Sequence, residues 1–314
     1  MRIWIHIGLQ KTGTTALQQW CAQNAAQLRE QGLLYLQLRE GLPACGPLTQ
    51  ALLEDRPELG AMIETLKAQI SRHGTCRAAL LSNEGFSQES PTLLRPLIEA
   101  FCGHEIGFIV TLRRQDRLAE ALYKQVVKFN GASAAPAQFL HSRHLRVLDY
   151  AQLLQNWQAA YPKARLMPLL YQEGGQDSIA QMLEALGYGA IVPPESAAFR
   201  RNITPAAELI AAYNQVPRAS AKALRRANQK LMARFEAQAA GHDDIFDRAT
   251  ALELLQRFEA SNLWVLQHYF PERATLFAPI EREEAKPLDP DILAEFQRQL
   301  AKEVKRLEKE TGAK

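Results

Sequence analysis

The sequence lacks the features that mark several large protein classes. No segment approaches the roughly 20 consecutive apolar residues of a membrane-spanning helix. No internal repeat or low-complexity tract is present. Lysine and arginine number 37 against 34 aspartates and glutamates, a formal net charge of +3. A dedicated nucleic-acid binder carries a large excess of positive charge, and this near balance excludes that class. Any anion-binding site must therefore be formed by a local group of residues.

Cysteine is scarce and widely spaced. Cys21, Cys45, Cys76 and Cys102 lie 24 or more residues apart and form no CxxC pair. We therefore expect reduced, buried thiols and no metal site. The opening MRIWIHIGLQ is too short for the apolar region of a secretory signal. We expect a soluble, cytoplasmic protein.

The apolar residues instead indicate an α/β fold. The 314 residues are 47% hydrophobic, which is enough for a substantial core. Short apolar runs at residues 3–7, 78–82, 106–112 and 164–171 predict strands, and segments with helical periodicity separate them. Strands that alternate with helices predict a doubly wound, mostly parallel sheet. We assign residues 1–200 to a nucleotide-binding α/β core.

Beyond about residue 190 the pattern predicts a largely helical C-terminal region, residues 201–314, packed on the core. Helices are expected at 205–215, 219–240 and 248–269, and a last one from Pro290 with Asp289 as N-cap. The last helix has one apolar stripe that could pack on its own chain or pair with a second subunit in a homodimer. The stripe consists of Leu293, Phe296, Leu300, Val304 and Leu307.

A glycine loop between the first strand and the first helix is the main functional motif. Gly8 to Thr15 have the first and last glycines of the phosphate loop G-x-x-x-x-G-K-[ST], but Thr14 stands at the lysine position and Lys11 lies inside the loop. Loop amides and the positive end of the next helix still form an anion cradle. The predicted binding residues are Gln10, Lys11, Thr12, Gly13, Thr14 and Thr15.

The loop lacks the arrangement that holds magnesium in nucleoside triphosphatases. The lysine is displaced, and the run at 78–82 leads into Ser-Asn-Glu rather than ending on an aspartate. A phosphosulfate donor has less charge to neutralise than a triphosphate. The sequence therefore favours sulfuryl over phosphoryl transfer.

Two segments resemble the sulfotransferases that use 3′-phosphoadenosine 5′-phosphosulfate, particularly the bacterial carbohydrate-type members, whose fold is of the P-loop type. HIGLQKTGTTALQ, residues 6–18, is similar to their 5′-phosphosulfate loop. VTLRRQDRLAEALYKQ, residues 110–125, is similar to their 3′-phosphate motif, in which an arginine is followed eight residues later by a serine. Arg113 fits this motif, whereas Ala121 replaces the serine.

Weaker likenesses extend over much of the chain, at Asp149, Tyr150 and Trp157, at residues 200–204, and at Ser261 with Asn262. Family members often close the nucleotide site with a late basic loop, so the resemblance implies a donor-binding role for Arg200 and Arg201. The alternative is an ordinary solvated loop.

The resemblance also implies a reaction, the transfer of a sulfuryl group to a hydroxyl acceptor such as a saccharide or glycolipid. The family base lies between the two motifs, where Glu84 follows the strand at 78–82. Lys11 would act on the bridging oxygen. Alternatively, Glu84 caps the next segment or pairs with an arginine. His6 is expected to be a hydrogen-bonded core residue.

Two other functions stay open. A magnesium-dependent kinase is disfavoured by the displaced lysine, and a non-catalytic nucleotide-binding descendant is suggested by Ala121. The basic segment 218–234 could guide an acidic glycan or an anionic headgroup, or be solvated surface. We expect no nucleic-acid partner.

Overall fold

The computed structural model describes residues 1–130, 136–172, 178–191, 245–280 and 289–311, with the isolated positions Ala223, Arg226, Ala227, Leu231 and Phe235. The helices expected at 205–215 and 219–240 lie wholly or mostly outside the described residues. The same holds for Arg200, Arg201 and most of the basic segment 218–234.

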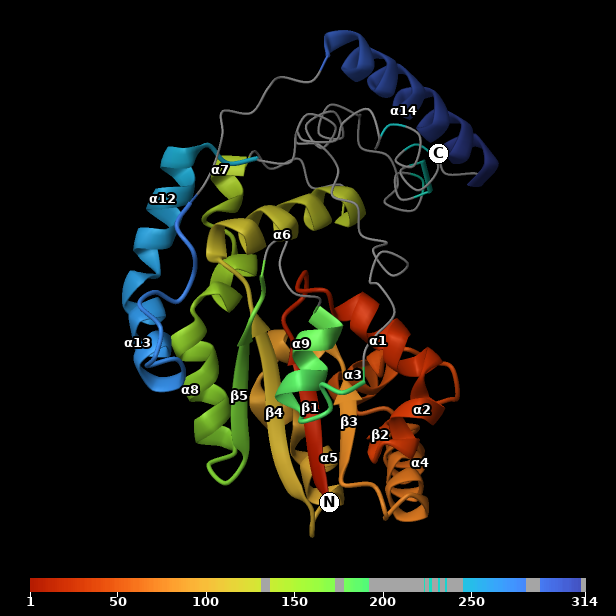
Figure 1. The fold of residues 1–314 in the computed structure, drawn as a ribbon. Coiled ribbons are helices and arrows are strands. Elements are labelled where there is room, and N and C mark those ends of the chain that lie inside the picture. The colour runs from red at the N-terminus through yellow and green to blue at the C-terminus, as the bar shows by residue number, and fades with distance from the viewer. Residues whose placement is uncertain are drawn as a thin grey trace. The chain divides into compact units, whose positions relative to one another are not determined.

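The described strands form a five-stranded parallel sheet (Figure 1). Its strands are β1 (Arg2–Gly8), β2 (Leu33–Tyr35), β3 (Ala78–Ser82), β4 (Glu105–Leu112) and β5 (Arg165–Leu170). They are ordered β2-β3-β1-β4-β5, with β1 in the middle. The α/β class and the four expected strands are confirmed, and β2 is an additional strand.

Both faces of the sheet are covered, which explains why its strands are nearly continuous apolar runs. On one face Trp4 packs in a buried cluster with residues of α1 (Thr14–Gln23), α2 (Ala25–Glu30) and α9 (Ser178–Ala185). On the other, the ring of Phe108 lies 4.7 Å from that of Trp157 in α8 (Tyr150–Ala160).

The chain divides into two compact units. Unit 1 comprises residues 1–114, 149–201 and 260–277, and thus the whole sheet. Its remaining elements are α3 (Gly46–Leu53), α4 (Leu59–Arg72), the 3₁₀ helices η1 (Glu84–Gln88) and η2 (Pro91–Leu94), α5 (Arg95–Ala100) and most of α13 (Glu259–Tyr269).

Unit 2 is helical where it is described. It contains α6 (Gln115–Asn130), α7 (Pro136–Phe139), the 3₁₀ helix η3 (Arg143–Leu148), α12 (Arg248–Arg257) and α14 (Pro290–Thr311). The single helix expected at 248–269 is wrong, because α12 ends before Phe258. The Phe258 N–H donates a hydrogen bond to the Leu255 carbonyl, three residues back, at 3.1 Å. This turn is tighter than an α-helical turn, and it separates α12 from α13.

The stripe of α14 packs within unit 2. Phe296, Leu300, Val304 and Leu307 are buried. The Phe296 ring lies 5.1 Å from that of Phe235. Asp289 accepts a hydrogen bond from the backbone N–H of Asp291 at 2.9 Å, as expected for a helix start. The apolar face of this helix is therefore covered by its own chain.

The four cysteines are all free thiols. Cys21, Cys45 and Cys76 are buried, as expected, whereas Cys102 is exposed. Among the described helices, none is both long enough and apolar enough to cross a membrane.

Candidate active site

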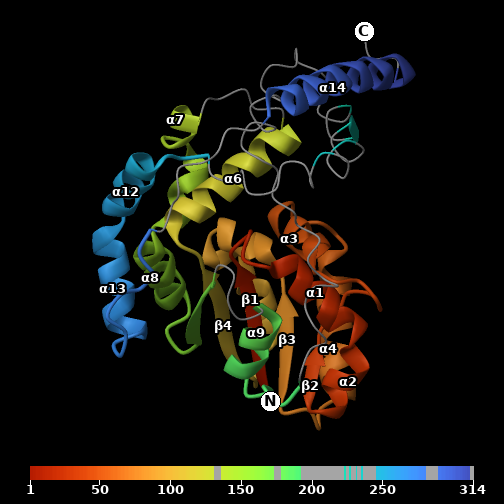
Figure 2. The same cartoon turned by 45° about the horizontal axis from the view of Figure 1, so that its top comes forward.

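The carboxyl edge of the sheet is where the motif residues meet. After β1 the chain builds β2 and β3 on one side and then β4 and β5 on the other, so the order switches beside β1. Ligands of open parallel sheets bind at such a point, outside the carboxyl ends of the strands. Figure 2 brings this edge of unit 1 forward, with the loop from β1 leading into α1. Glu84, Arg113 and Tyr171 follow β3, β4 and β5 at the same edge.

Both glycines of the loop are required by its geometry. Gly8 has a φ of 116° and Gly13 a φ of 82°, in the region that favours glycine. A Cβ on Gly8 would lie 3.0 Å from Ser87 Oγ and 3.1 Å from the Glu84 carbonyl oxygen, and one on Gly13 would lie 2.5 Å from Ser178 Oγ. The loop backbone is therefore closely enclosed by η1 and by the start of α9.

Lys11 also has a left-handed backbone, with a φ of 62°. This conformation is unfavourable for a residue with a Cβ and persists where the surroundings fix it. Two hydrogen bonds hold the loop here. The Thr12 hydroxyl donates to the Leu9 carbonyl at 2.6 Å, and Arg113 Nη1 donates to the Lys11 carbonyl at 2.9 Å.

The start of α1 has no side-chain cap. Gly13 occupies the N-cap and cannot accept from the first amides, and the first turn contains no acidic residue. Asp149 caps α8 and Asp247 caps α12, whereas α3, α4 and α5 also begin without a side-chain cap, so α1 is distinguished by the glycine loop before it. An uncapped helix start that follows a glycine loop offers N–H donors and the positive end of the helix dipole to an anion. Thr14 is buried there and Thr15 is exposed.

Glu84 reaches this helix start from the neighbouring strand. The Thr14 hydroxyl donates a hydrogen bond to the Glu84 carboxylate. The capping role considered for Glu84 belongs to Asn83, whose Oδ1 accepts from the Gly85 N–H at 3.0 Å. No arginine lies within ion-pair distance of Glu84 among the described residues. The half-buried carboxylate therefore faces the loop.

A buried polar network lies beneath the loop. His6 Nδ1 is 2.8 Å from Ser82 Oγ, and Gln18 Nε2 donates to the same oxygen at 3.2 Å. The network ties β1, β3 and α1 together. Burial lowers the pKa of His6 to about 4, so the imidazole is neutral near pH 7. His6 is a core residue, as expected.

Arg113 is held from several sides. Its guanidinium carbon lies 4.9 Å from the centre of the Tyr171 ring. Its carbonyl accepts a hydrogen bond from the Tyr150 hydroxyl. Asp149, which precedes that tyrosine, accepts from Ser261 Oγ at 2.8 Å. Three positions of weak family likeness, Asp149, Tyr150 and Ser261, thus support the segment that carries Arg113.

The structure brings the loop together with Glu84 and Arg113. Arg200 and Arg201 lie outside the described residues, and Ala121 lies half-buried in α6. Sequence reasoning missed Tyr171 and Ser178 as neighbours of the loop. Tyr171 could have been found because it is the last residue of an expected strand, whereas no pattern marks Ser178. Within the described parts of the chain, no cluster of three or more histidine, cysteine, aspartate or glutamate side chains could hold a metal ion.

Comparison with protein-family models and with curated proteins finds no match. Among solved structures, a sulfotransferase from Alicyclobacillus acidocaldarius is similar at 14% sequence identity and a TM-score of 0.42. The match covers 62% of this chain and 84% of that chain. A likeness at this level carries no information on activity, which has to come from the site residues.

Proposed function

We propose that this protein is a sulfotransferase that moves a sulfuryl group from 3′-phosphoadenosine 5′-phosphosulfate to a hydroxyl acceptor. The observation that carries the proposal is the hydrogen bond from Thr14 to Glu84. It joins a helix start without a side-chain cap to a half-buried carboxylate that neither caps a helix nor pairs with an arginine among the described residues. A donor site and a base therefore adjoin each other.

Donor binding would use the loop and the two flanking strand ends. The amides at the start of α1, with Lys11, Thr15 and the Thr14 hydroxyl once it turns from Glu84 to the ligand, would hold the 5′-phosphosulfate, and Gln10 would lie at the loop rim. Thr12 would contribute through its backbone, because its hydroxyl already donates to Leu9. Arg113 would bind the 3′-phosphate. Arg200 and Arg201, outside the described residues, are proposed to close the site over the nucleotide.

The transfer would be an in-line displacement at sulfur. The acceptor oxygen forms a bond to sulfur while its proton passes to the Glu84 carboxylate. The bond between sulfur and the bridging oxygen breaks, and its electron pair stays on the 5′-phosphate of the departing 3′-phosphoadenosine 5′-phosphate. The Lys11 ammonium would stabilise the charge that develops on this oxygen. No metal is needed for this charge balance.

The shape of the loop favours this chemistry over that of a magnesium-dependent kinase. The lysine of the phosphate loop is absent at position 14, and the Thr14 side chain there is directed to Glu84. The family resemblance supplies the 3′-phosphate of the donor, which Arg113 would bind although Ala121 replaces the motif serine, and a saccharide or glycolipid as acceptor.

Calorimetric titration tests the proposal. We expect 3′-phosphoadenosine 5′-phosphate to bind with micromolar affinity, about −8 kcal/mol, without metal. ATP with magnesium serves as the comparison ligand. Preferential binding of ATP with magnesium would reject the sulfotransferase in favour of a kinase. Binding of neither ligand would point to a non-catalytic descendant.

A further inference from the structure

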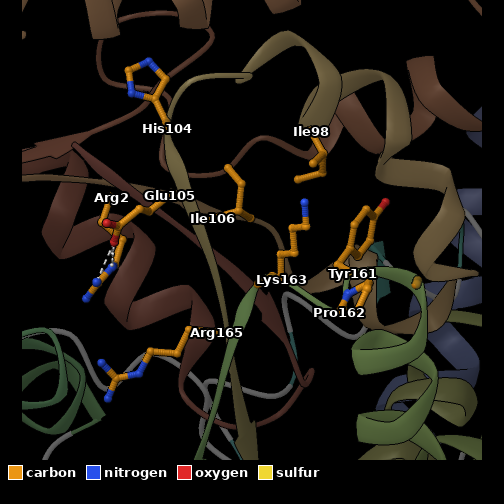
Figure 3. Close-up of a pocket in the computed structure, with 11 residues that line it drawn as sticks. Arg2, Ile98, His104, Glu105, Ile106, Tyr161, Pro162, Lys163 and Arg165 are labelled. Carbon is orange, nitrogen blue, oxygen red and sulfur yellow. Dashed lines mark hydrogen bonds and ion pairs between the residues drawn. The ribbon is translucent and has the colours of Figure 1, made fainter.

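A cavity lies at the amino edge of the sheet, opposite the candidate site, in unit 1 (Figure 3). It has a volume of about 510 Å³, which is within the range of small-molecule sites. Its walls come from the first residues of β1, β4 and β5, from α5, and from the turn between α8 and β5. The loop and Glu84 are at the carboxyl edge, so this cavity belongs to neither the donor site nor the proposed reaction.

The charges around the cavity leave an excess of cations. Arg2 forms two hydrogen bonds to the Glu105 carboxylate, at 2.9 and 2.6 Å, and is neutralised by it. Lys163 has no ion-pair or hydrogen-bond partner among the described residues. The Arg165 guanidinium is 5.8 Å from the Trp4 ring centre, and no carboxylate pairs with it in the described parts of the chain. An anion is therefore the complementary ligand.

The surroundings of Lys163 are apolar. Figure 3 shows its side chain between Ile106 and Tyr161, with the amino group toward Ile98, while Arg165 extends away from them. The Tyr161 hydroxyl donates to the Pro91 carbonyl at 2.8 Å, so its position is fixed. Burial raises the pKa of Tyr161 to about 12, which keeps the phenol neutral beside the ammonium group.

We propose that this cavity binds a small organic anion, a sulfonate, sulfate ester or carboxylate carried on a flat apolar body. The anionic group pairs with Lys163, and the apolar body lies against Ile98, Ile106 and the Tyr161 ring. Lys163 is exposed, and an exposed ion pair alone is weak and screened by salt. A bare inorganic anion would use only that pair, whereas an aromatic anion also buries the apolar wall.

Two probes of nearly the same shape test the proposal on the full chain. Naphthalene-2-sulfonate carries the anion, and naphthalene-2-sulfonamide is its neutral counterpart. We expect calorimetry to give one site per chain for the sulfonate, with the sulfonamide bound about fivefold more weakly, the size of one exposed ion pair. Lys163→Met should abolish this difference. Lys302→Met, at another exposed lysine without a described partner, should leave it unchanged.

Three results would overturn the proposal. The first is absence of sulfonate binding to the unaltered protein at millimolar concentration. The second is a preference for the sulfonate over the sulfonamide that is the same in the unaltered protein and in the Lys163→Met variant. The third is displacement of the sulfonate by 3′-phosphoadenosine 5′-phosphate, which would place the probe on the loop. Retention of the sulfonate at nucleotide concentrations that saturate the protein supports a separate site, and if the nucleotide does not bind, the loss of the preference in Lys163→Met locates the probe.

Discussion

The Thr14 hydroxyl donates its hydrogen bond to the Glu84 carboxylate, and this contact joins the helix start after β1 to the segment after β3. The residues belong to elements on neighbouring strands, 70 positions apart in the sequence. Any anion that binds the start of α1 will therefore lie close to Glu84.

Glu84→Gln should separate catalysis from binding. The amide still offers Thr14 an acceptor oxygen, but it cannot take a proton. We expect turnover to fall about 10²- to 10⁴-fold, while affinity for 3′-phosphoadenosine 5′-phosphate changes by less than about threefold. Release of this nucleotide from the phosphosulfate donor measures turnover. Glu89→Gln, in the same segment, should behave like the unaltered protein. A parallel loss of both quantities in Glu84→Gln would assign Glu84 to binding or folding.

Thr14→Val removes the hydroxyl at the helix start and keeps the branched side chain. We expect affinity for 3′-phosphoadenosine 5′-phosphate to fall about tenfold, the size of one hydrogen bond to a charged group. Calorimetry measures the change. Thr14→Ser retains the hydroxyl and should stay within about twofold of the unaltered protein. If the serine variant bound as weakly as the valine variant, the methyl group rather than the hydroxyl would be responsible.

Arg113→Gln tests which part of the nucleotide the arginine contacts. We expect about 30-fold weaker binding of 3′-phosphoadenosine 5′-phosphate, because a charge-assisted contact is lost. Binding of adenosine 5′-phosphate, which lacks the 3′-phosphate, should change by less than about threefold. A similar loss for both ligands would mean that Arg113 acts only by holding the Lys11 carbonyl.

Gly13→Ala should destabilise the fold. Its backbone has a φ of 82°, and the added Cβ would lie 2.5 Å from Ser178 Oγ. We expect the free energy of unfolding in urea to fall by about 2 kcal/mol. Adding Ser178→Gly should restore the free energy of unfolding that is lost to the steric clash. The loss caused by the backbone conformation of Ala at position 13 should remain. Gly60→Ala, in α4 with open space around it, should not destabilise. Unchanged stability of Gly13→Ala would contradict the loop geometry.

The buried His6 should make stability depend on pH. Its pKa is lowered from 6.5 to about 4 in the folded protein. Below pH 6.5 the unfolded chain therefore takes up a proton that the folded chain does not, and stability falls until the pH reaches about 4. Above pH 6.5 this contribution is constant. Between pH 7 and pH 5, the free energy of unfolding, measured with urea, should fall by about 2 kcal/mol more in the unaltered protein than in His6→Gln. Equal slopes for the two proteins would refute a neutral buried imidazole.

The sequence pattern predicted the central strands because parallel strands covered on both faces are continuous apolar runs. It missed β2, whose three residues, Leu33–Tyr35, are too few to form a periodic signal. It also joined α12 and α13, because the apolar periodicity continues through Phe258 while the backbone turns more tightly there. Local hydrogen bonding decided the helix boundary.

The candidate site was predictable to the extent that it follows strand ends. Lys11, Glu84 and Arg113 each follow a parallel strand, so their common edge results from the topology. The role of Asn83 could also have been read from its position before a helical turn, where asparagine is a favoured cap. The approach of Ser178 to Gly13 could not, because it depends on how α9 packs against α1.

The division into two units has a spectroscopic consequence. All four tryptophans, Trp4, Trp20, Trp157 and Trp264, belong to unit 1. Tryptophan emission during denaturation therefore reports the sheet-containing unit, whereas far-ultraviolet circular dichroism also records the helices of unit 2. If the two units unfold independently, the two signals will follow different denaturation curves. The ligands proposed here bind unit 1, so they will shift the fluorescence curve to higher denaturant concentration.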